Sequence, residues 1–384
     1  GLGKASMRLY YIANARMPNE KGHGIQIAEM CDAFIKAGVD LTLVVPERSV
    51  TQEDMKTFYA LQQPVPLVQL WIPKLFVFGK FGFFMSSLFF MMCYSFFLVG
   101  RRMRGERFFI YTIDMDGFSS TLLPFFGPCV TEMHTPKKMS LAQKIFFSRL
   151  RGVIATTTLT RDSLVKTFSF PHKNCIVEPN GVDVGRFAAP LSKENARRRL
   201  SLPLSSKFAF YVGRFYEWKG LDILPAACRE LLSKDIECYV VGGTEQQFKE
   251  VTSENIPDNL HIMGAKSPTE TPLWLAACDT ALVLGTARND ASFRFTSPMK
   301  LFEYMAARVP IVASDTPALQ DVLTTQETFF YEHDNAASLA EKIIESINNT
   351  EETTLHIERA YTKVQHHTLQ ARAARILDFI EAVK

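Results

Sequence analysis

Two successive series of short β-rich runs, each alternating with helical patterns, constrain the fold of this 384-residue chain most. Strand, helix and strand in succession predict right-handed crossovers and a mostly parallel sheet. The chain is also too long for one ordinary core. We therefore predict an α/β protein of two Rossmann-like domains, residues 7–185 and 186–365, facing a cleft lined by strand C-termini. The predicted strands are 8–14, 40–46, 67–72, 107–113, 128–133 and 152–158, then 208–214, 236–243, 260–265, 280–286 and 309–315.

Composition narrows the class of protein. A net charge of +3 is too small to predict a nucleic-acid partner. Seven scattered cysteines without a CxxC pair or a histidine cluster argue against a metal site and favour a reduced, cytoplasmic protein. No signal peptide opens the chain, and the six residues before Met7 are expected to lie outside the fold. Turn residues cluster at 179–190, where we place the linker.

The first candidate site is "YVGRFYEWKGLDIL", residues 211–224. A predicted strand ends at Gly213, Arg214 and Lys219 follow in the loop, and a helix begins near Gly220. Two cations and a helix N-terminus suit a diphosphate. The alternative is that both cations are solvated loop charges.

The second candidate site is "TSPMKLFEYMAARVPIVASD", residues 296–315. Pro298 suits the first turn of a helix, and Ser297 can cap it. Lys300 and Glu303 stand three residues apart and could simply pair across one turn. The other interpretation is that Glu303 accepts ribose hydroxyls while Lys300 and the amides around Ser297, Pro298 and Met299 face phosphate.

Together these motifs resemble the retaining nucleotide-sugar glycosyltransferases of family four, which have the GT-B fold. The resemblance extends over nearly the whole chain from Met7. It implies that the "GR…KG" residues Arg214 and Lys219 hold the donor diphosphate. It also implies that Glu303, the second glutamate of an E-x7-E element, holds the donor ribose. Phe295 stands where the family has the first glutamate, so Asp290 or the amides near Ser297 remain open as its replacement.

Other segments agree with the resemblance. "EPNGVDVGRF" (178–187) is similar to the family's NGVD segment. "TEMHTPKK" (131–138) resembles the segment in which a histidine follows a strand of the first domain, which implies that His134 lies near the donor sugar. A satisfied strand-end histidine is the alternative. The remaining site residues are implied by three glycine-containing turns. They are Gly22, His23 and Gly24 for acceptor or phosphate, Gly243 beneath the nucleotide, and Ala265 near the base.

The phenylalanine-rich stretch 81–100 has no charged residue and is long enough to span a membrane. Predicted strands of one sheet flank it, so we expect a crossover helix with Gly82, Ser86 and Cys93 toward the sheet. Exposed aromatic residues beside arginines would suit an anionic membrane surface. The alternative is a helix buried between domains or in a dimer. The expected membrane contacts are Phe83, Phe84, Phe90, Phe97, Arg101, Arg102 and Arg104.

The resemblance implies a metal-independent enzyme without a cofactor other than its UDP-, GDP- or ADP-sugar donor. Its acceptor would be lipid-linked or a membrane glycan, at the cytoplasmic face of the membrane. It also implies that a C-terminal helix in 366–384 returns to the first domain. Two rivals keep the same fold, a nucleotide-sugar 2-epimerase and a non-catalytic membrane-docked partner. A Rossmann dehydrogenase is disfavoured because "GHGIQI" lacks the three-glycine fingerprint.

Overall fold

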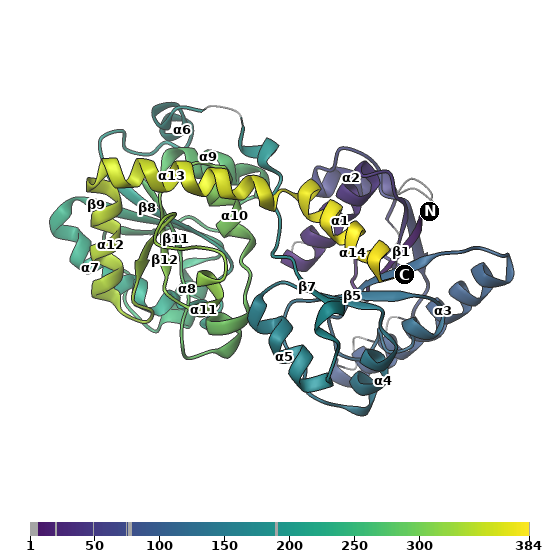
Figure 1. Cartoon of the computed structure of the whole chain (residues 1–384). Helices are drawn as coiled ribbons and strands as arrows, with labels where there is room; N and C mark the ends of the chain where they lie inside the picture. The colour runs from purple at the N-terminus through teal and green to yellow at the C-terminus, as the bar shows by residue number, and fades with distance from the viewer. Residues whose placement is uncertain are drawn as a thin grey trace. The chain divides into compact units, whose positions relative to one another are not determined.

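A computed structural model describes residues 7–19, 21–48, 50–73, 75, 79–188 and 191–383. It divides the chain into two compact units (Figure 1). The first comprises the residues up to Pro179 and those from Leu369 onward, and the second is Asn180–Thr368. The breaks therefore fall at 179–180 and 368–369, whereas the sequence predicted 185–186 and 365–366. The six residues before Met7 lie outside the described part of the chain.

The first unit is built on a parallel seven-stranded sheet in the order β3-β2-β1-β4-β5-β6-β7. Six of these strands were predicted, although several end earlier than expected. β7 was not predicted. The strands are β1 Arg8–Ile12, β2 Asp40–Pro46, β3 Leu67–Leu70, β4 Phe109–Ile113, β5 Cys129–Met133, β6 Gly152–Ala155 and β7 Cys175–Val177.

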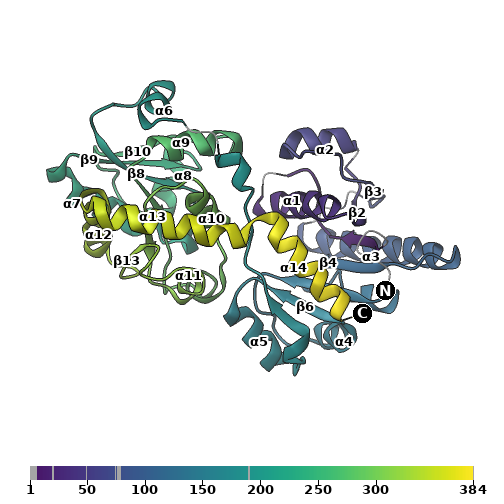
Figure 2. The same ribbon diagram turned by 45° about the horizontal axis from the view of Figure 1, so that its top comes forward.

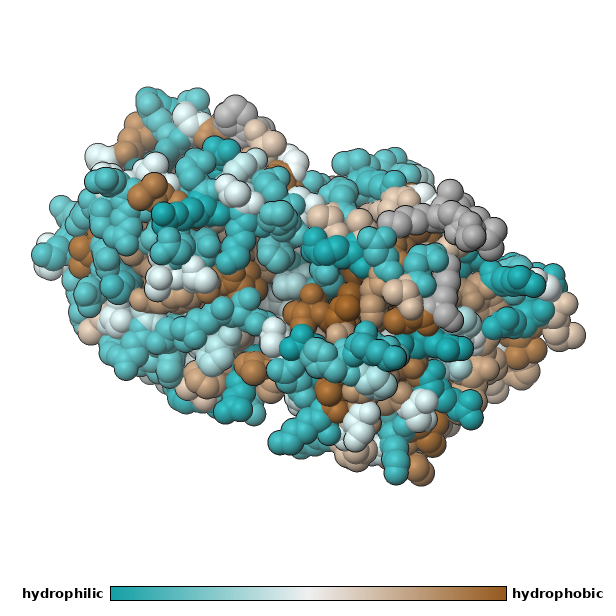
Figure 3. Space-filling model, viewed as in Figure 1, coloured by the Kyte–Doolittle hydropathy of each residue, from teal (hydrophilic) through white to brown (hydrophobic). Residues whose placement is uncertain are grey.

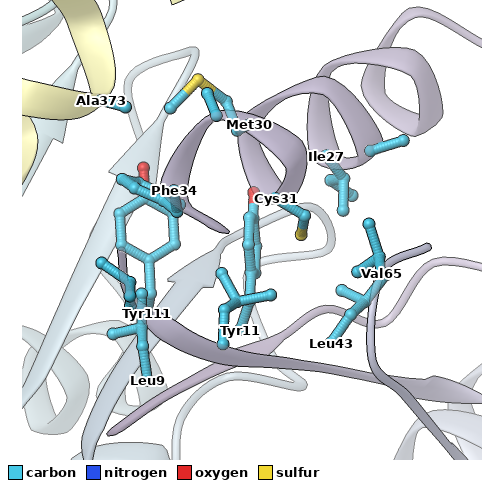
Figure 4. Packing of buried hydrophobic residues seen from close by; sticks show 14 of the residues in the cluster. Leu9, Tyr11, Ile27, Met30, Cys31, Phe34, Leu43, Val65, Tyr111 and Ala373 are labelled. Carbon is cyan, nitrogen blue, oxygen red and sulfur yellow. The ribbon is translucent and has the colours of Figure 1, made fainter. Parts of the chain in front are cut away.

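Helices cover both faces of this sheet (Figure 2). On one face lie α1 (Gly22–Lys36), α2 (Gln52–Tyr59) and α14 (Leu369–Ala382). On the other lie α3 (Gly79–Met103), α4 (Leu141–Arg149) and α5 (Thr158–Phe168). Alternate residues of each strand pack into the hydrophobic cores on the two faces of the sheet, because successive strand side chains point to opposite faces. Leu9 and Tyr11 of β1, for example, pack under Ile27 and Phe34 of α1 (Figure 4).

The C-terminal helix α14 belongs to the first unit, as the resemblance implied. Ala373, Ile376, Leu377 and Ile380 recur at helical spacing and are fully buried against that unit's core. α14 lies beside α1 in both ribbon views.

The second unit has a parallel six-stranded sheet in the order β10-β9-β8-β11-β12-β13. Five strands were predicted, and β13 was not. The strands are β8 Lys207–Val212, β9 Ile236–Val241, β10 Leu260–Ile262, β11 Thr280–Val283, β12 Ile311–Ser314 and β13 Phe329–Tyr331. The helices are α6 Lys193–Arg199, α7 Leu224–Leu231, α8 Glu245–Thr252, α9 Thr271–Ala277, α10 Met299–Ala306, α11 Pro317–Gln320, α12 Ala336–Asn348 and α13 Thr350–Val364.

Both sheets reverse their strand order at one central pair, β1 with β4 and β8 with β11. Open parallel sheets bind ligands outside the carboxyl ends of the strands at such a reversal. The candidate site in the second unit is therefore expected beside the ends of β8 and β11.

Helix α3 is the one described helix long and apolar enough to cross a membrane by length and composition. Its flanking strands β3 and β4 lie in one sheet, and α3 packs on that sheet as a crossover. The predicted sheet-facing stripe was partly wrong, because Cys93 is only half-buried and large side chains make the contact. The residues buried on this face are Gly82, Ser86, Ser87, Phe90, Met91, Tyr94 and Leu98.

Two of the predicted membrane contacts are consequently corrected. Phe90 is 1% exposed and belongs to the core under α3, beside Tyr94. Phe97 is half-buried, with its ring edge-on to Tyr10 of β1. Phe83 and Phe84 are exposed as predicted, together with Phe81, Leu88, Met92, Phe96, Val99 and Met103. Brown atoms lie over α3 in Figure 3.

Candidate functional site

Glycine backbones bring the ends of β8, β9 and β10 together in the second unit. A Cβ atom on Gly242 would lie 1.7 Å from the carbonyl oxygen of Gly213, so only glycine fits between these two loops. The Gly242 N–H donates to the Gly264 carbonyl at 3.0 Å. Gly243, which was predicted to lie beneath the nucleotide, is buried, and Arg214 and Ala265 are exposed at the same sheet edge.

Lys219 ends a 3-10 turn, Glu217–Lys219, and the next residue fixes its place. Gly220 has a positive φ of 73°, and a Cβ there would lie 2.8 Å from the Gly285 carbonyl oxygen, just beyond β11. The loop thus lies against the reversal between β8 and β11. The same turn contacts the π-helical turn Ala291–Phe295. Lys219 is thereby held at the place where a ligand is expected.

The electrostatics of Lys219 are unusual. Its ammonium lies 4.2 Å from the ring centre of Trp218, and no carboxylate among the described residues pairs with it. Part of its surface remains open to solvent, yet desolvation lowers its pKa to about 8. A desolvated cation without an anionic partner is costly for the folded chain. Such a group is suited to receive an anion.

The start of α10 differs from the prediction. Pro298 is the N-cap residue, and no side chain caps the helix, so Ser297 is not the cap. Ser297 is held by Asn180 of the NGVD segment instead. The Asn180 N–H donates to the Ser297 hydroxyl at 3.2 Å, and its side-chain amide donates to the Ser297 carbonyl at 2.6 Å. The first-turn N–H groups of Met299 and Lys300 therefore have neither a helical acceptor nor a cap.

The two charges of α10 do form the simple pair that the sequence left open. Lys300 Nζ lies 2.8 Å from Glu303 Oε2. Glu303 is 9% exposed, and its other oxygen, Oε1, bonds to no group in the described ranges. The neighbouring Tyr304 hydroxyl accepts the Val212 N–H at 3.2 Å, which fixes this turn to the end of β8. Lys300 orients Glu303 and leaves one carboxylate oxygen for a ligand.

Neither open replacement for the missing first glutamate gains support. Phe295 is half-buried in the π-helical turn. The Asp290 side chain is 78% exposed and lies 3.5 Å from Arg294. Asn180 bonds to the hydroxyl and the carbonyl of Ser297 and to no backbone N–H group there, so the amides stay open as a replacement. The donor sugar contact therefore has no assigned carboxylate.

In the first unit, Gly22, His23 and Gly24 form the opening turn of α1 rather than a loop before it. A Cβ on Gly24 would lie 2.5 Å from the Asn19 side chain and 2.8 Å from the Tyr59 hydroxyl oxygen. These contacts within the protein explain why a glycine stands at position 24, and no ligand is needed to explain it. Gly22 is exposed and His23 half-buried.

His134 follows β5 and is bonded to a carboxylate that sequence reasoning missed. Its Nε2 lies 2.8 Å from Glu132 Oε1, and its side chain is 33% exposed. Glu132 is 0% exposed and pairs with Arg372 of α14 at 2.7 Å. A glutamate within an otherwise apolar strand could have drawn attention to Glu132, but its partner Arg372 lies 240 residues further along the chain.

A family model adds to these observations. The model described as glycosyl transferases group 1 matches residues 192–363, which include Lys219, Lys300 and Glu303. The matched segment is somewhat less than half of the chain, and over it the chain is similar to glycosyl transferases group 1. Over these residues the resemblance to a glycosyltransferase family, drawn from the motifs, is confirmed.

Two curated relatives match part of this chain at low sequence identity. D-inositol 3-phosphate glycosyltransferase of Corynebacterium aurimucosum is 24% identical over 48% of this chain and 45% of its own. Phosphatidyl-myo-inositol mannosyltransferase of Mycobacterium leprae is 24% identical over 67% of this chain and 68% of its own. The chain thus spans about half the length of the first relative and two thirds of the second.

A solved structure fixes the fold of both units. Anabaena Alr3699/HepE, solved in complex with UDP and glucose, superposes with a TM-score of 0.75 at 16% identity. The match covers 98% of this chain and 100% of the other. The chain has the GT-B fold, as the resemblance implied.

Proposed function

We propose that this protein is a retaining glycosyltransferase whose second unit binds a nucleoside diphosphate-sugar donor. The observation that carries the proposal is Lys219, a desolvated cation without a carboxylate partner beside the β8/β11 reversal. Glu303, with one oxygen left open at the end of β8, supplies acceptors for ribose hydroxyls. The family of residues 192–363 and the relatives' names support the same activity.

The proposed chemistry is mainly electrostatic. Lys219 and the exposed Arg214 neutralise the diphosphate as the bond from the anomeric carbon to phosphate oxygen breaks, and the first-turn N–H groups of α10 assist. The acceptor hydroxyl oxygen bonds to the same face of that carbon. Its proton passes to the departing phosphate oxygen. This front-face route is carried over from family four and needs neither metal nor cofactor.

We expect Glu303→Gln to fold like wild type and to bind the donor about 10- to 100-fold more weakly. Hydrogen bonds to a charged group contribute about 1.5–3 kcal/mol. The measurement is thermal shift across UDP-, GDP- and ADP-sugars, because a bound donor stabilises the fold by mass action. The base and sugar that raise the midpoint identify the donor.

The matched control is Glu358→Gln, which removes an exposed glutamate paired with Arg308 on the same unit. It should leave the donor shift unchanged. If Glu303→Gln kept the full donor shift, the assignment of Glu303 to the donor would be wrong.

We also propose that the acceptor is lipid-linked and that α3 holds the protein on an anionic membrane. Eight large apolar residues of α3 are exposed, with Phe81 at 69% and Phe96 at 73% exposure. Residues 79–151 hold ten lysines and arginines against four acidic residues. Of those four, Asp114 and Glu132 are buried, and Glu106 pairs with Arg101. Apolar side chains beside unpaired basic charge favour a bilayer over a second protein.

The direction of α3 supports this use. Ser87 bonds with Asn14 and Asp116, which directly follow β1 and β4 at the carboxyl edge of the sheet. Arg102 lies over Phe108 before β4, at the opposite edge. The phenylalanine-rich end of α3 therefore lies at the ligand-binding edge, and the arginines anchor the other end.

We expect Phe81→Ser/Phe84→Ser to reduce pelleting with phosphatidylglycerol vesicles at least about tenfold, since each side chain contributes on the order of 2 kcal/mol when buried. Phe58→Ser is the control, because Phe58 is as exposed as Phe84 but lies on α2, across the sheet. Wild type that never pellets, or a concentration-dependent dimer lost with the double variant, would contradict membrane docking.

The two rivals differ in products. An epimerase needs carboxylates that exchange protons, whereas the carboxylate beside His134 is fully buried and held by several donors. Nucleotide release that depends on a lipid acceptor supports transfer. Release without acceptor but with an altered sugar indicates epimerisation, and no release with any donor indicates a non-catalytic partner.

A further inference from the structure

A buried polar cluster inside the first unit surrounds Glu132. Its Oε1 accepts from Gln26 of α1, from His134 at 2.8 Å and from Arg372 of α14 at 2.7 Å. Its Oε2 accepts from the Tyr111 hydroxyl and, at 3.4 Å, from Arg372. Both oxygens thus accept from donors on α1, β4, α14 and the segment after β5. A carboxylate held in this way has one position.

The cluster also fixes the charge of Glu132. Burial alone would raise its pKa, but the charge of Arg372 and the bond from His134 outweigh burial and hold the pKa well below its usual range. Glu132 therefore accepts and never donates at neutral pH. The hydrogen between the two residues must lie on His134 Nε2.

The second ring nitrogen then has a defined role. Within the described ranges, no group bonds to His134 Nδ1. In a neutral ring whose Nε2 carries the hydrogen, Nδ1 carries the lone pair. It can accept a hydrogen bond from a hydroxyl, whereas the opposite tautomer cannot.

We propose that Glu132 and Arg372 are positioning residues that hold His134 in the Nε2–H tautomer, so that Nδ1 accepts a hydrogen bond from a substrate hydroxyl. The inference rests on the proposed function for its substrate, since a sugar ring supplies the hydroxyl. Arg372 acts through Glu132 and touches no reacting atom. Arg372 also donates to the backbone carbonyls of Pro179 and Glu178. This side chain, at the start of α14, therefore connects β5 with the residues at which the first unit ends and resumes, Pro179 and Leu369.

The test reads the tautomer directly. Protein labelled with 15N-histidine gives long-range nitrogen–hydrogen spectra at pH 8, where an ordinary imidazole is neutral, and His134→Gln identifies the His134 signals. Wild type should show Nε2–H. In Glu132→Gln the side-chain amide can donate as well as accept, so both tautomers of His134 should appear. We expect kcat to fall by up to about tenfold and the donor KM to change by a smaller factor. An Nδ1–H ring in wild type would overturn the proposal.

Arg375→Gln is the matched control. Arg375 lies one turn along α14 and pairs with Glu178 at 2.8 Å, with no bond to Glu132. It should change neither tautomer nor kcat. Should Glu132→Gln fail to fold, Arg372→Lys keeps the charge and loses the two-pronged contact, and it should show the same mixture in weaker form. A lower kcat with an unchanged tautomer would assign the cluster a purely structural role. The tautomer needs no donor, so a failure of the proposed function is seen separately as absent transfer by wild type.

Discussion

Replacing Lys219 with methionine should make the unliganded second unit more stable while abolishing sugar transfer. The folded chain holds this ammonium in a desolvated place, which lowers its pKa from 10.5 to about 8. At neutral pH the protonated side chain therefore costs up to about 3 kcal/mol relative to the unfolded chain. Methionine fills similar volume without that charge. Transfer should fall about 100- to 1,000-fold or more, since the charge that we propose to stabilise the leaving diphosphate is lost.

The pH dependence gives this prediction its sign. Between about pH 8 and pH 10.5 the unfolded chain keeps the Lys219 proton and the folded chain releases it. The unfolded state thus binds more protons, and the stability of wild type rises through this window. Lys219→Met should lack that rise. Urea unfolding at pH 7 and pH 10, followed by tryptophan fluorescence in a Trp71→Phe background, reports the second unit through Trp218 and Trp274.

Lys234→Met is the control for the loss of a lysine. Lys234 is exposed beyond α7 in the same unit. It should leave stability and transfer as in wild type. A destabilised Lys219→Met protein would show that the ammonium has a stabilising partner, and full transfer would remove Lys219 from the donor site.

The fold was largely predictable because two signals agreed over long stretches. Runs such as 40–46 and 208–214 are apolar and β-branched or aromatic, and glycine ends the helix between the first two strands at Gly38. β7 and β13 have three residues each, too few to show a period, whereas the equally short β10 was predicted within the longer run 260–265. The place of β7 and β13 at sheet edges follows from tertiary pairing with β6 and β12.

The residues of the candidate donor site were predictable only where local chemistry decides their position. Lys219 and Glu303 lie within short motifs whose strand, turn and helix are local. Ser297 was assigned a cap because a serine before Pro298 has that role by propensity, but Asn180 competes for its hydroxyl from 117 residues away. Phe90 was placed outside because a uniformly apolar helix gives no periodic sign of its buried face.

The buried pair of Glu132 and Arg372 is the clearest case of a feature beyond local sequence, and breaking it should have the second large effect. Arg372→Met leaves a carboxylate at 0% exposure without its cation. We expect a cost of about 3–5 kcal/mol, because removing one partner strands a buried charge. The first unit should then melt on the order of 10 °C lower. Arg375→Gln, whose lost pair is 40% exposed on the arginine side, should cost less than about 1 kcal/mol.

Acid unfolding separates this pair from simple packing loss. The folded-state pKa of Glu132 is depressed, so the stability it contributes is present above its unfolded pKa of about 4.3 and is lost as pH falls below it. Arg372→Met should flatten that acid limb as well as lower the midpoint. The double change Glu132→Leu/Arg372→Met should recover most of the stability, since apolar pairs of similar volume replace buried ion pairs at little cost. A double variant no more stable than Arg372→Met alone would mean that the Pro179 and Glu178 carbonyls, rather than Glu132, are what Arg372 stabilises.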